Sequence, residues 1–168
     1  YPSGLPLDKW RLISMPAVLD ETGVGLVIGD ELGTQDDELW RLFEYDQTSS
    51  SYRENPIDFI VSESYWIYQR VENDLLLGTP AGETGNMSGT SLSLVPGWSF
   101  IGSPYPFEIN ISLDQVQFYG PITYGLAAEE WSSVVTELDP WNGYVVYNRT
   151  ASDQTITLDP TVSSAGLA

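Results

Sequence analysis

The sequence predicts an all-β fold of two similar small units, each a curved sheet or a partly open barrel with one short helix. Short apolar stretches alternate with turn residues along all 168 residues of the chain. The composition includes 15 Gly and 11 Pro for turns, and six Trp, ten Tyr and five Phe for strands. A hydrophobic content of 42% is enough for a packed core, and phrases from the first half return in the second.

The two halves keep a fixed spacing between equivalent residues. Three pairs near the start of each half lie 88 positions apart, and two later pairs lie 79 positions apart. A single nine-residue difference relates all five pairs, which indicates an internal duplication, with chance similarity between two β-rich halves as the competing interpretation. The pairs are Trp10 and Trp98, Ile13 and Ile101, Pro16 and Pro104, Tyr45 and Tyr124, and Tyr68 and Tyr147.

The first unit is expected at residues 1–78. Residues 10–15 alternate as a strand does, and Pro16 ends it. A short helix is expected between Asp20 and Gly33, where valine and isoleucine recur at helical spacing. Residues 39–46 and 65–71 then alternate as strands, which makes this unit mainly β.

The second unit is expected at residues 92–160. The intervening residues 79–91 are rich in Gly, Ser and Thr and predict a linker or a long hairpin. A Gly-Trp turn starts a strand at Gly97, Ser112 can cap a single helical turn, and residues 143–148 form a late strand. The small, polar residues 161–168 are expected to be a tail.

The charge and the missing residue types exclude several functions. The net charge of −18 repels phosphate backbones, so we expect no nucleic-acid partner. The acidity itself fits solubility, adaptation to high salt or loose calcium binding. Without Cys or His, disulfides, thiolate nucleophiles, His-based triads and ordinary zinc sites are excluded. No apolar stretch approaches the roughly 18–20 residues that span a bilayer, so no membrane insertion is expected.

Two phrases resemble a tandem repeat of large secreted or cell-surface proteins of bacteria and archaea. They are GWSFIGSP at residues 97–104 and LDPWNGYVVY at residues 138–147. In that family a Gly-Trp strand opens each unit, a Tyr-Asp strand follows the helix, and a Gly-Tyr-Trp strand ends the unit. Residues 45–46 and 65–68 are similar to the later elements, whereas Lys9 and Ser64 replace the two glycines of the first copy.

The resemblance implies an extracellular, non-catalytic module and supplies no ligand and no functional residue. We therefore expect a structural, adhesive or assembly module of a larger secreted or cell-surface protein, with other protein modules or cell-surface components as partners. The alternative is a carbohydrate-binding module of a secreted polysaccharide-degrading enzyme, with polysaccharide as the ligand.

Aromatic residues beside turns are the candidate ligand-binding residues, because the apolar faces of sugar rings stack on exposed aromatic rings. We expect Tyr105 and Phe107, on either side of Pro106, and Trp131 and Trp141 to be exposed in this way. Packing in the core or in turns is the competing interpretation for all four. The repeated Trp10 and Trp98 are expected in the core, so a ligand site is sought where the copies differ.

An acidic turn is the candidate metal site. Asp36, Asp37 and Glu38 offer the oxygen ligands that calcium prefers, without the spacing of an EF-hand. An acidic turn in water is the competing interpretation, and no other cofactor is expected.

Catalysis would have to rely on carboxylates alone. A glycosidase needs two acids about 5–10 Å apart in a cleft, and Glu44 with Glu54, or Glu129 with Glu137, could face each other across a hairpin. With 24 acidic residues such pairs arise by accident. We therefore expect no catalytic residues and no enzyme.

Overall fold

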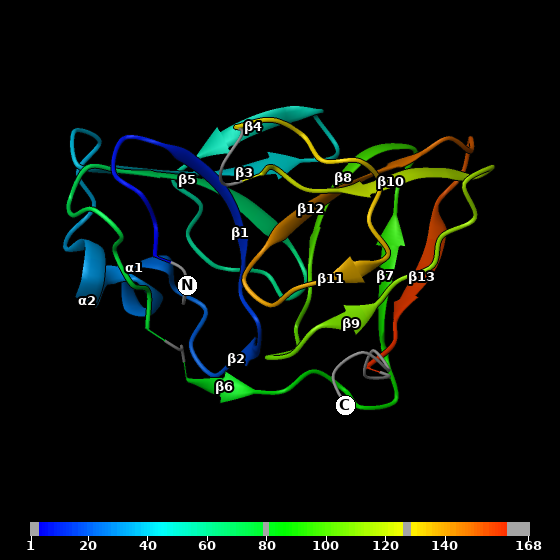
Figure 1. The fold of residues 1–168 in the computed structure, drawn as a ribbon, viewed down its shortest axis with the longest axis horizontal. Coiled ribbons are helices and arrows are strands. Elements are labelled where there is room, and N and C mark those ends of the chain that lie inside the picture. Colours follow the sequence, from blue (N-terminus) through cyan, green and yellow to red (C-terminus); the bar gives the residue numbers. More distant parts are fainter. Residues whose placement is uncertain (1–3, 79–80, 126–128, 161–168) are drawn as a thin grey trace.

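The protein is β-dominated, as the sequence predicts. The computed structural model describes residues 4–78, 81–125 and 129–160, and within them 13 strands form several small antiparallel sheets with two short helices and no closed barrel (Figure 1). Figure 1 shows the first unit, with both helices, on the left and the second unit on the right.

The first unit is built on a four-stranded antiparallel sheet. Its strand order is β1-β5-β3-β4. Along β3 and β5 buried residues alternate with partly exposed ones, so one face of the sheet packs on a core and the other is more open. The strands are β1 (Trp10–Ser14), β5 (Ser64–Gln69), β3 (Trp40–Asp46) and β4 (Ser51–Glu54).

The second unit repeats this sheet with three strands. The order is β10-β12-β8, formed by β10 (Phe118–Ile122), β12 (Gly143–Asn148) and β8 (Gly97–Gly102). The register matches the first sheet: Trp10 lies opposite Tyr68 in β5, and Trp98 lies opposite Tyr147 in β12. β8 and β12 are therefore the counterparts of β1 and β5.

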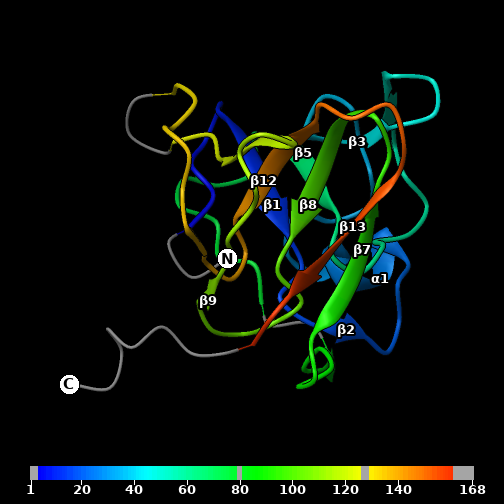
Figure 2. The ribbon, with the colours of Figure 1, turned by 90° about the vertical axis from the view of Figure 1, so that its right-hand side faces the viewer.

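Three short two-stranded ladders complete the fold, and Figure 2 shows β7 beside β13 at the second unit's end. The expected linker, residues 79–91, contains β6 and the start of β7, and its residues 79–80, like the tail 161–168, lie outside the described residues. The ladders are β2 (Val18–Leu19) with β6 (Gly82–Glu83), β7 (Thr90–Leu94) with β13 (Gln154–Leu158), and β9 (Ile109–Asn110) with β11 (Glu137–Leu138).

The two units meet through contacts that are exchanged reciprocally. The backbone N–H of Ser14 donates to the carbonyl of Trp141 at 2.8 Å, and the N–H of Gly102 donates to the carbonyl of Ser62 at 2.9 Å. Ser14 and Gly102 are 88 positions apart, and Ser62 and Trp141 are 79 apart, so each hydrogen bond is the repeat equivalent of the other. A contact that is returned in this way defines a two-fold relation, here internal to one chain.

Small residues allow the strands to approach at this two-fold seam. Ser14, Ser64, Gly102 and Gly143 are all buried there. A Cβ added to Gly143 would lie 2.6 Å from the Ser64 Cβ, and one added to Gly102 would overlap the Ser14 side chain. The two glycines are therefore required by close backbone approach.

Both helices belong to the first unit and account for its extra residues. The Val24 N–H donates to the carbonyl of Ile57, and the equivalent Ile111 N–H donates to Thr136. After this point the first unit continues into α1 (Val24–Val27) and α2 (Gly29–Leu32). The second unit goes directly to a turn at residues 115–117, so the helical turn expected after Ser112 is not formed.

The buried apolar residues form three clusters. One lies in each unit, and the third, made of Leu12, Phe100, Ile122 and Val145, joins the open faces of the two sheets. Trp141 comes from the second unit but packs in the cluster of the first. The third cluster is the floor of the surface that these two open faces form together.

Candidate functional site: an aromatic groove across both sheets

The open faces of the two sheets form one continuous aromatic surface, which we call the aromatic groove. Among the residues that the structure describes, twelve aromatic residues line it, including four of the six tryptophans. Strand alternation explains the concentration, since each ring occupies an outward position beside another ring on the next strand. The residues are Trp10, Phe43, Tyr45, Tyr52, Trp66, Tyr68, Trp98, Phe100, Tyr119, Tyr124, Trp131 and Tyr147.

The repeated tryptophans are exposed on this surface and do not belong to the core. Trp10 is 38% exposed and Trp98 39%, so the expectation that both are core residues is wrong. The physical reason is their register: each is the first outward residue of its strand and packs at an angle against a tyrosine of the neighbouring strand. The ring centroids are 5.2 Å apart for Trp10 and Tyr68 and 4.9 Å apart for Trp98 and Tyr147.

Rings from one unit are held by rings of the other. Trp66 of the first unit contacts Tyr124 and Trp131 of the second, with centroids 5.1 and 5.8 Å apart. In return, Phe100 of the second unit contacts Tyr45 and Tyr52 of the first, at 4.8 and 5.8 Å. These stacked and edge-on contacts fix the ring orientations, so the groove is preformed.

The groove contains two pockets. Their volumes are about 420 and 400 Å³, within the range of about 300–1,000 Å³ that is usual for small-molecule sites. Tyr52, which is 53% exposed, and Trp131, which is 43% exposed, line both pockets. The first pocket is lined by Trp10, Phe43, Tyr52, Trp66, Tyr124 and Trp131, and the second by Tyr45, Tyr52, Trp98, Phe100, Tyr119, Ile122, Trp131 and Val145.

A charged rim borders the groove beside Trp10. The Arg70 guanidinium lies 2.9 Å from the Asp8 carboxylate, which also accepts a hydrogen bond from the Tyr68 hydroxyl at 2.8 Å. Arg41 donates to the Glu54 carboxylate at 2.5 Å, and this hydrogen bond lowers the pKa of Glu54. These side chains place donors and acceptors next to flat apolar rings.

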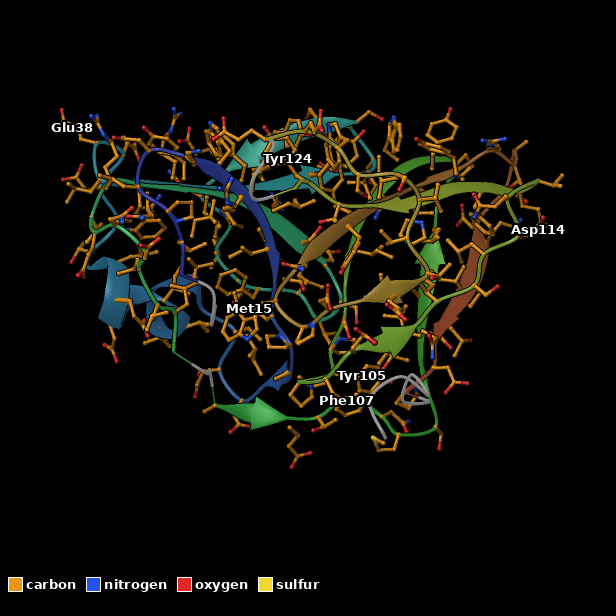
Figure 3. The ribbon with its side chains drawn as sticks, in the orientation of Figure 1. Met15, Glu38, Tyr105, Phe107, Asp114 and Tyr124 are labelled. Carbon is orange, nitrogen blue, oxygen red and sulfur yellow. The ribbon has the colours of Figure 1, made fainter. Side chains whose placement is uncertain are left out.

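Of the four aromatic residues predicted to bind a ligand, only Trp131 lies in the groove. Tyr105 is completely buried, and its hydroxyl donates to the carbonyl of Asn86 at 2.8 Å. Trp141 is 7% exposed because it packs in the first unit's core, and Phe107 packs half-buried on the second core. Figure 3 shows Tyr105 and Phe107 on the opposite side of the molecule from Tyr124. The expected exposure of Tyr105 and Trp141 is wrong.

The acidic turn is explained by backbone geometry. The Asp36 carboxylate accepts the Glu38 N–H at 2.9 Å, and in the second unit the Asp114 carboxylate accepts the Val116 N–H at the same distance. Asp114 has no acidic neighbours, so the aspartate itself is a turn residue. Within residues 4–78, 81–125 and 129–160 no three His, Cys, Asp or Glu side chains are grouped so that they could hold a metal ion, and the calcium site at Asp36, Asp37 and Glu38 stays a prediction.

The candidate carboxylates Glu44 and Glu54 do not face each other as hydrolase acids would. Glu44 and Glu54 occupy alternate positions, because Glu44 lies opposite Arg53 and Glu54 lies opposite Phe43 in the β3-β4 ladder. They therefore point to opposite faces, where Arg53 holds Glu44 and Arg41 holds Glu54. In the second pair, Glu129 is bound to Lys9, while Glu137 sits in β11 opposite Asn110.

Sequence reasoning missed most of the groove, although a signal was present. Aromatic residues recur at alternate positions in strands 40–46 and 64–69, and repeat positions link Tyr52 to Trp131. Both features mark one face of a sheet. The face shared by the two units was not evident, because it depends on how the sheets meet at the seam.

The chain is without detectable relatives in three comparisons: no family model, no curated protein and no solved structure matches it. Among the described residues, no helix is long and apolar enough to cross a bilayer.

Proposed function

We propose that this chain is a non-catalytic binding module that holds a neutral polysaccharide in the aromatic groove. The observation that carries the proposal is the set of half-exposed, mutually braced rings spread across both sheets. Large exposed apolar patches on a protein mark interaction sites, because they are costly to leave in water. A groove open along its length suits an extended ligand.

Sugar rings fit the chemistry of this groove. Their axial C–H groups form apolar faces that stack on Trp and Tyr, while their hydroxyls seek hydrogen bonds at the edges. The apolar rings of Trp10 and Trp66 supply the first requirement. The rim of Asp8, Arg41 and Arg70 supplies the second, since carboxylates and guanidinium groups can bind paired hydroxyls.

Charge favours a neutral polymer. The net charge of −18 repels nucleic acids and acidic polysaccharides, and the positive charges of Arg41 and Arg70 at the rim are balanced by the carboxylates of Glu54 and Asp8. The stacking of a neutral sugar on aromatic rings does not depend on the negative electrostatic field of the protein. A polyanion would have to bind against the repulsion from that field.

An extracellular setting, within a larger secreted or cell-surface protein, is part of the same proposal. It rests on the resemblance of residues 97–104 and 138–147 to surface-protein repeats. Polysaccharides are abundant in that setting, and the module would attach its parent protein to them.

Affinity electrophoresis in gels containing neutral glucans, mannans or xylans tests the proposal. The wild type should be retarded by at least one neutral polysaccharide and not by alginate or pectin. Tyr52→Ala and Trp131→Ala should abolish retardation, and Ile57→Ala, at a side chain 83% exposed outside the groove, should not. Equal mobility of the wild type in every gel would exclude the proposal.

A second function, adhesion to a protein partner, is favoured by one observation. The groove combines Trp, Tyr and Arg, the residues that dominate energetic hot spots at protein interfaces. A self-associating module would show this in sedimentation equilibrium: concentration-dependent dimerisation that Trp131→Ala removes supports adhesion, and a monomer at every concentration excludes self-assembly.

A further inference from the structure

The aromatic groove contains the same pocket twice. By the internal repeat, Trp10 of the first pocket is equivalent to Trp98 of the second. In the same way Phe43 is equivalent to Ile122, and Trp66 to Val145. The repeat also exchanges Tyr52 with Trp131, as shown by two matching pairings: Tyr45 lies opposite Tyr52, and Tyr124 lies opposite Trp131. Tyr52 and Trp131 therefore line both pockets and form the junction between them.

The seam contacts establish that this equivalence is a two-fold rotation. Ile13 bridges Asn142, and Ile101 bridges Glu63, which is the same contact made from the other unit. The two sheets meet at this seam, and the groove floor of Leu12, Phe100, Ile122 and Val145 contains residues from both units. The two pockets consequently open on the same face and adjoin each other.

We propose that the groove holds two carbohydrate subsites related by this internal two-fold, and that one neutral polysaccharide chain occupies both while stacked on Tyr52 and Trp131. This inference rests on the proposed carbohydrate-binding function and adds the number of subsites, their residues and their connection. A chain that fills one subsite reaches the other without a second loss of translational freedom. Affinity should therefore rise steeply with chain length.

The two subsites differ in strength. The first has the larger rings, with Phe43 and Trp66 where the second has Ile122 and Val145. The first also has the charged rim: Asp8 beside Tyr68 corresponds to Pro96, and Arg41, opposite Tyr68, corresponds in register to Tyr119, opposite Tyr147. Stacking and hydrogen bonding to the rim both favour the first subsite, whereas the charged neighbour of the second is Arg149, which lies over the Tyr119 ring.

Calorimetric titration with oligosaccharides cut from the polysaccharide that the wild type binds most tightly tests the inference. A matched pair of variants, Trp10→Ala and Trp98→Ala, removes equivalent, equally exposed rings, one from each subsite. The wild type should bind two short oligosaccharides but one long one. Each variant should bind one short oligosaccharide, and each should lose about tenfold or more in affinity for the long one. Trp10→Ala should lose more.

Control measurements separate binding from folding. Thermal unfolding should show both variants folded, and Ile57→Ala should keep the wild-type stoichiometry and affinity. A wild type that binds one short oligosaccharide, with Trp98→Ala unchanged, would overturn the two-subsite inference while leaving carbohydrate binding intact. Failure of the wild type to bind any neutral polysaccharide would overturn both.

Discussion

The two units share one sheet design and differ at its periphery. Both place a tryptophan opposite a tyrosine on the open face, and both return the same hydrogen bonds at the seam. In the part of the chain that the structure describes, the helices α1 and α2 and the ion pair of Asp8 with Arg70 are found only in the first unit. The residues that build the seam and the groove are therefore present in both units, whereas the elements around them differ.

This comparison separates structural repetition from functional repetition. The equivalence of the small seam residues in the two units is explained by packing, because Ser14 and Gly102 are buried in close contact with each other. Repetition of Trp10 and Trp98 is not explained by packing, since about two-fifths of each side chain faces water. The proposed ligand surface would account for an exposed aromatic position that occurs in both copies.

Replacing Trp141 should have the largest effect on stability. Its repeat equivalent is Ser62, yet Trp141 fills the core of the opposite unit. Trp141→Ala should lower the free energy of unfolding by about 3–5 kcal/mol in a urea titration. A loss below about 1 kcal/mol would show that the units are stable independently of this insertion.

Adding one methyl group at the seam should have the next largest effect on stability. Gly102→Ala places a Cβ against Ser14 and should cost about 1–3 kcal/mol in the same titration. The control is Gly25→Ala in α1, where nothing lies within 4 Å of the added atom and stability should rise by about 0.5–1 kcal/mol. Similar effects of both variants would contradict a tightly packed seam.

The aspartates of the two equivalent turns should contribute alike. Asp36→Ala and Asp114→Ala each remove an acceptor for a backbone N–H, and each should cost about 0.5–2 kcal/mol. Addition of calcium should leave both losses and the wild-type melting temperature unchanged. A calcium-dependent rise in melting temperature that Asp36→Ala alone abolishes would show that calcium binds at Asp36, Asp37 and Glu38.

The smallest effect is expected at Glu63, which occupies the seam position that Asn142 fills in the other unit. Burial, and then the nearby Glu44 carboxylate, raise the pKa of Glu63, so the folded state favours its neutral form. Stability from this group is present at low pH and is lost as pH rises from the ordinary glutamate pKa through the raised one.

Glu63→Gln should therefore melt at a higher temperature than the wild type at pH 7. The difference should disappear below about pH 4, where glutamate is protonated in both states. A variant that is less stable than the wild type at pH 7 would mean that the ionised Glu63 is favourably paired.

The sequence was sufficient to predict the repeating parts of the fold. The Trp10–Trp98 and Tyr45–Tyr124 spacings predicted two β-units, and the nine-residue difference located the segment that forms α1 and α2. These features are local or periodic, which is why they are visible without a structure.

The candidate site was predicted only at Trp131. Tyr105 is buried in the core of its own unit, whereas Trp141 is buried in the core of the other unit. No local sequence pattern reveals either contact. The exposure of Trp98 was mispredicted for the reverse reason: repetition was attributed to packing, whereas the register of β8 turns the ring outward.

Intrinsic tryptophan fluorescence tests the central claim, that the repeated aromatic face is the ligand surface, most directly. Four of the six tryptophans line the groove, and Trp40 and Trp141 are buried in the core. Titration with the retarding neutral polysaccharide should shift and quench the emission saturably. The change should shrink in the Trp10→Ala, Trp98→Ala double variant. Binding that leaves the emission unchanged would contradict the account, because the ligand would then lie outside the groove.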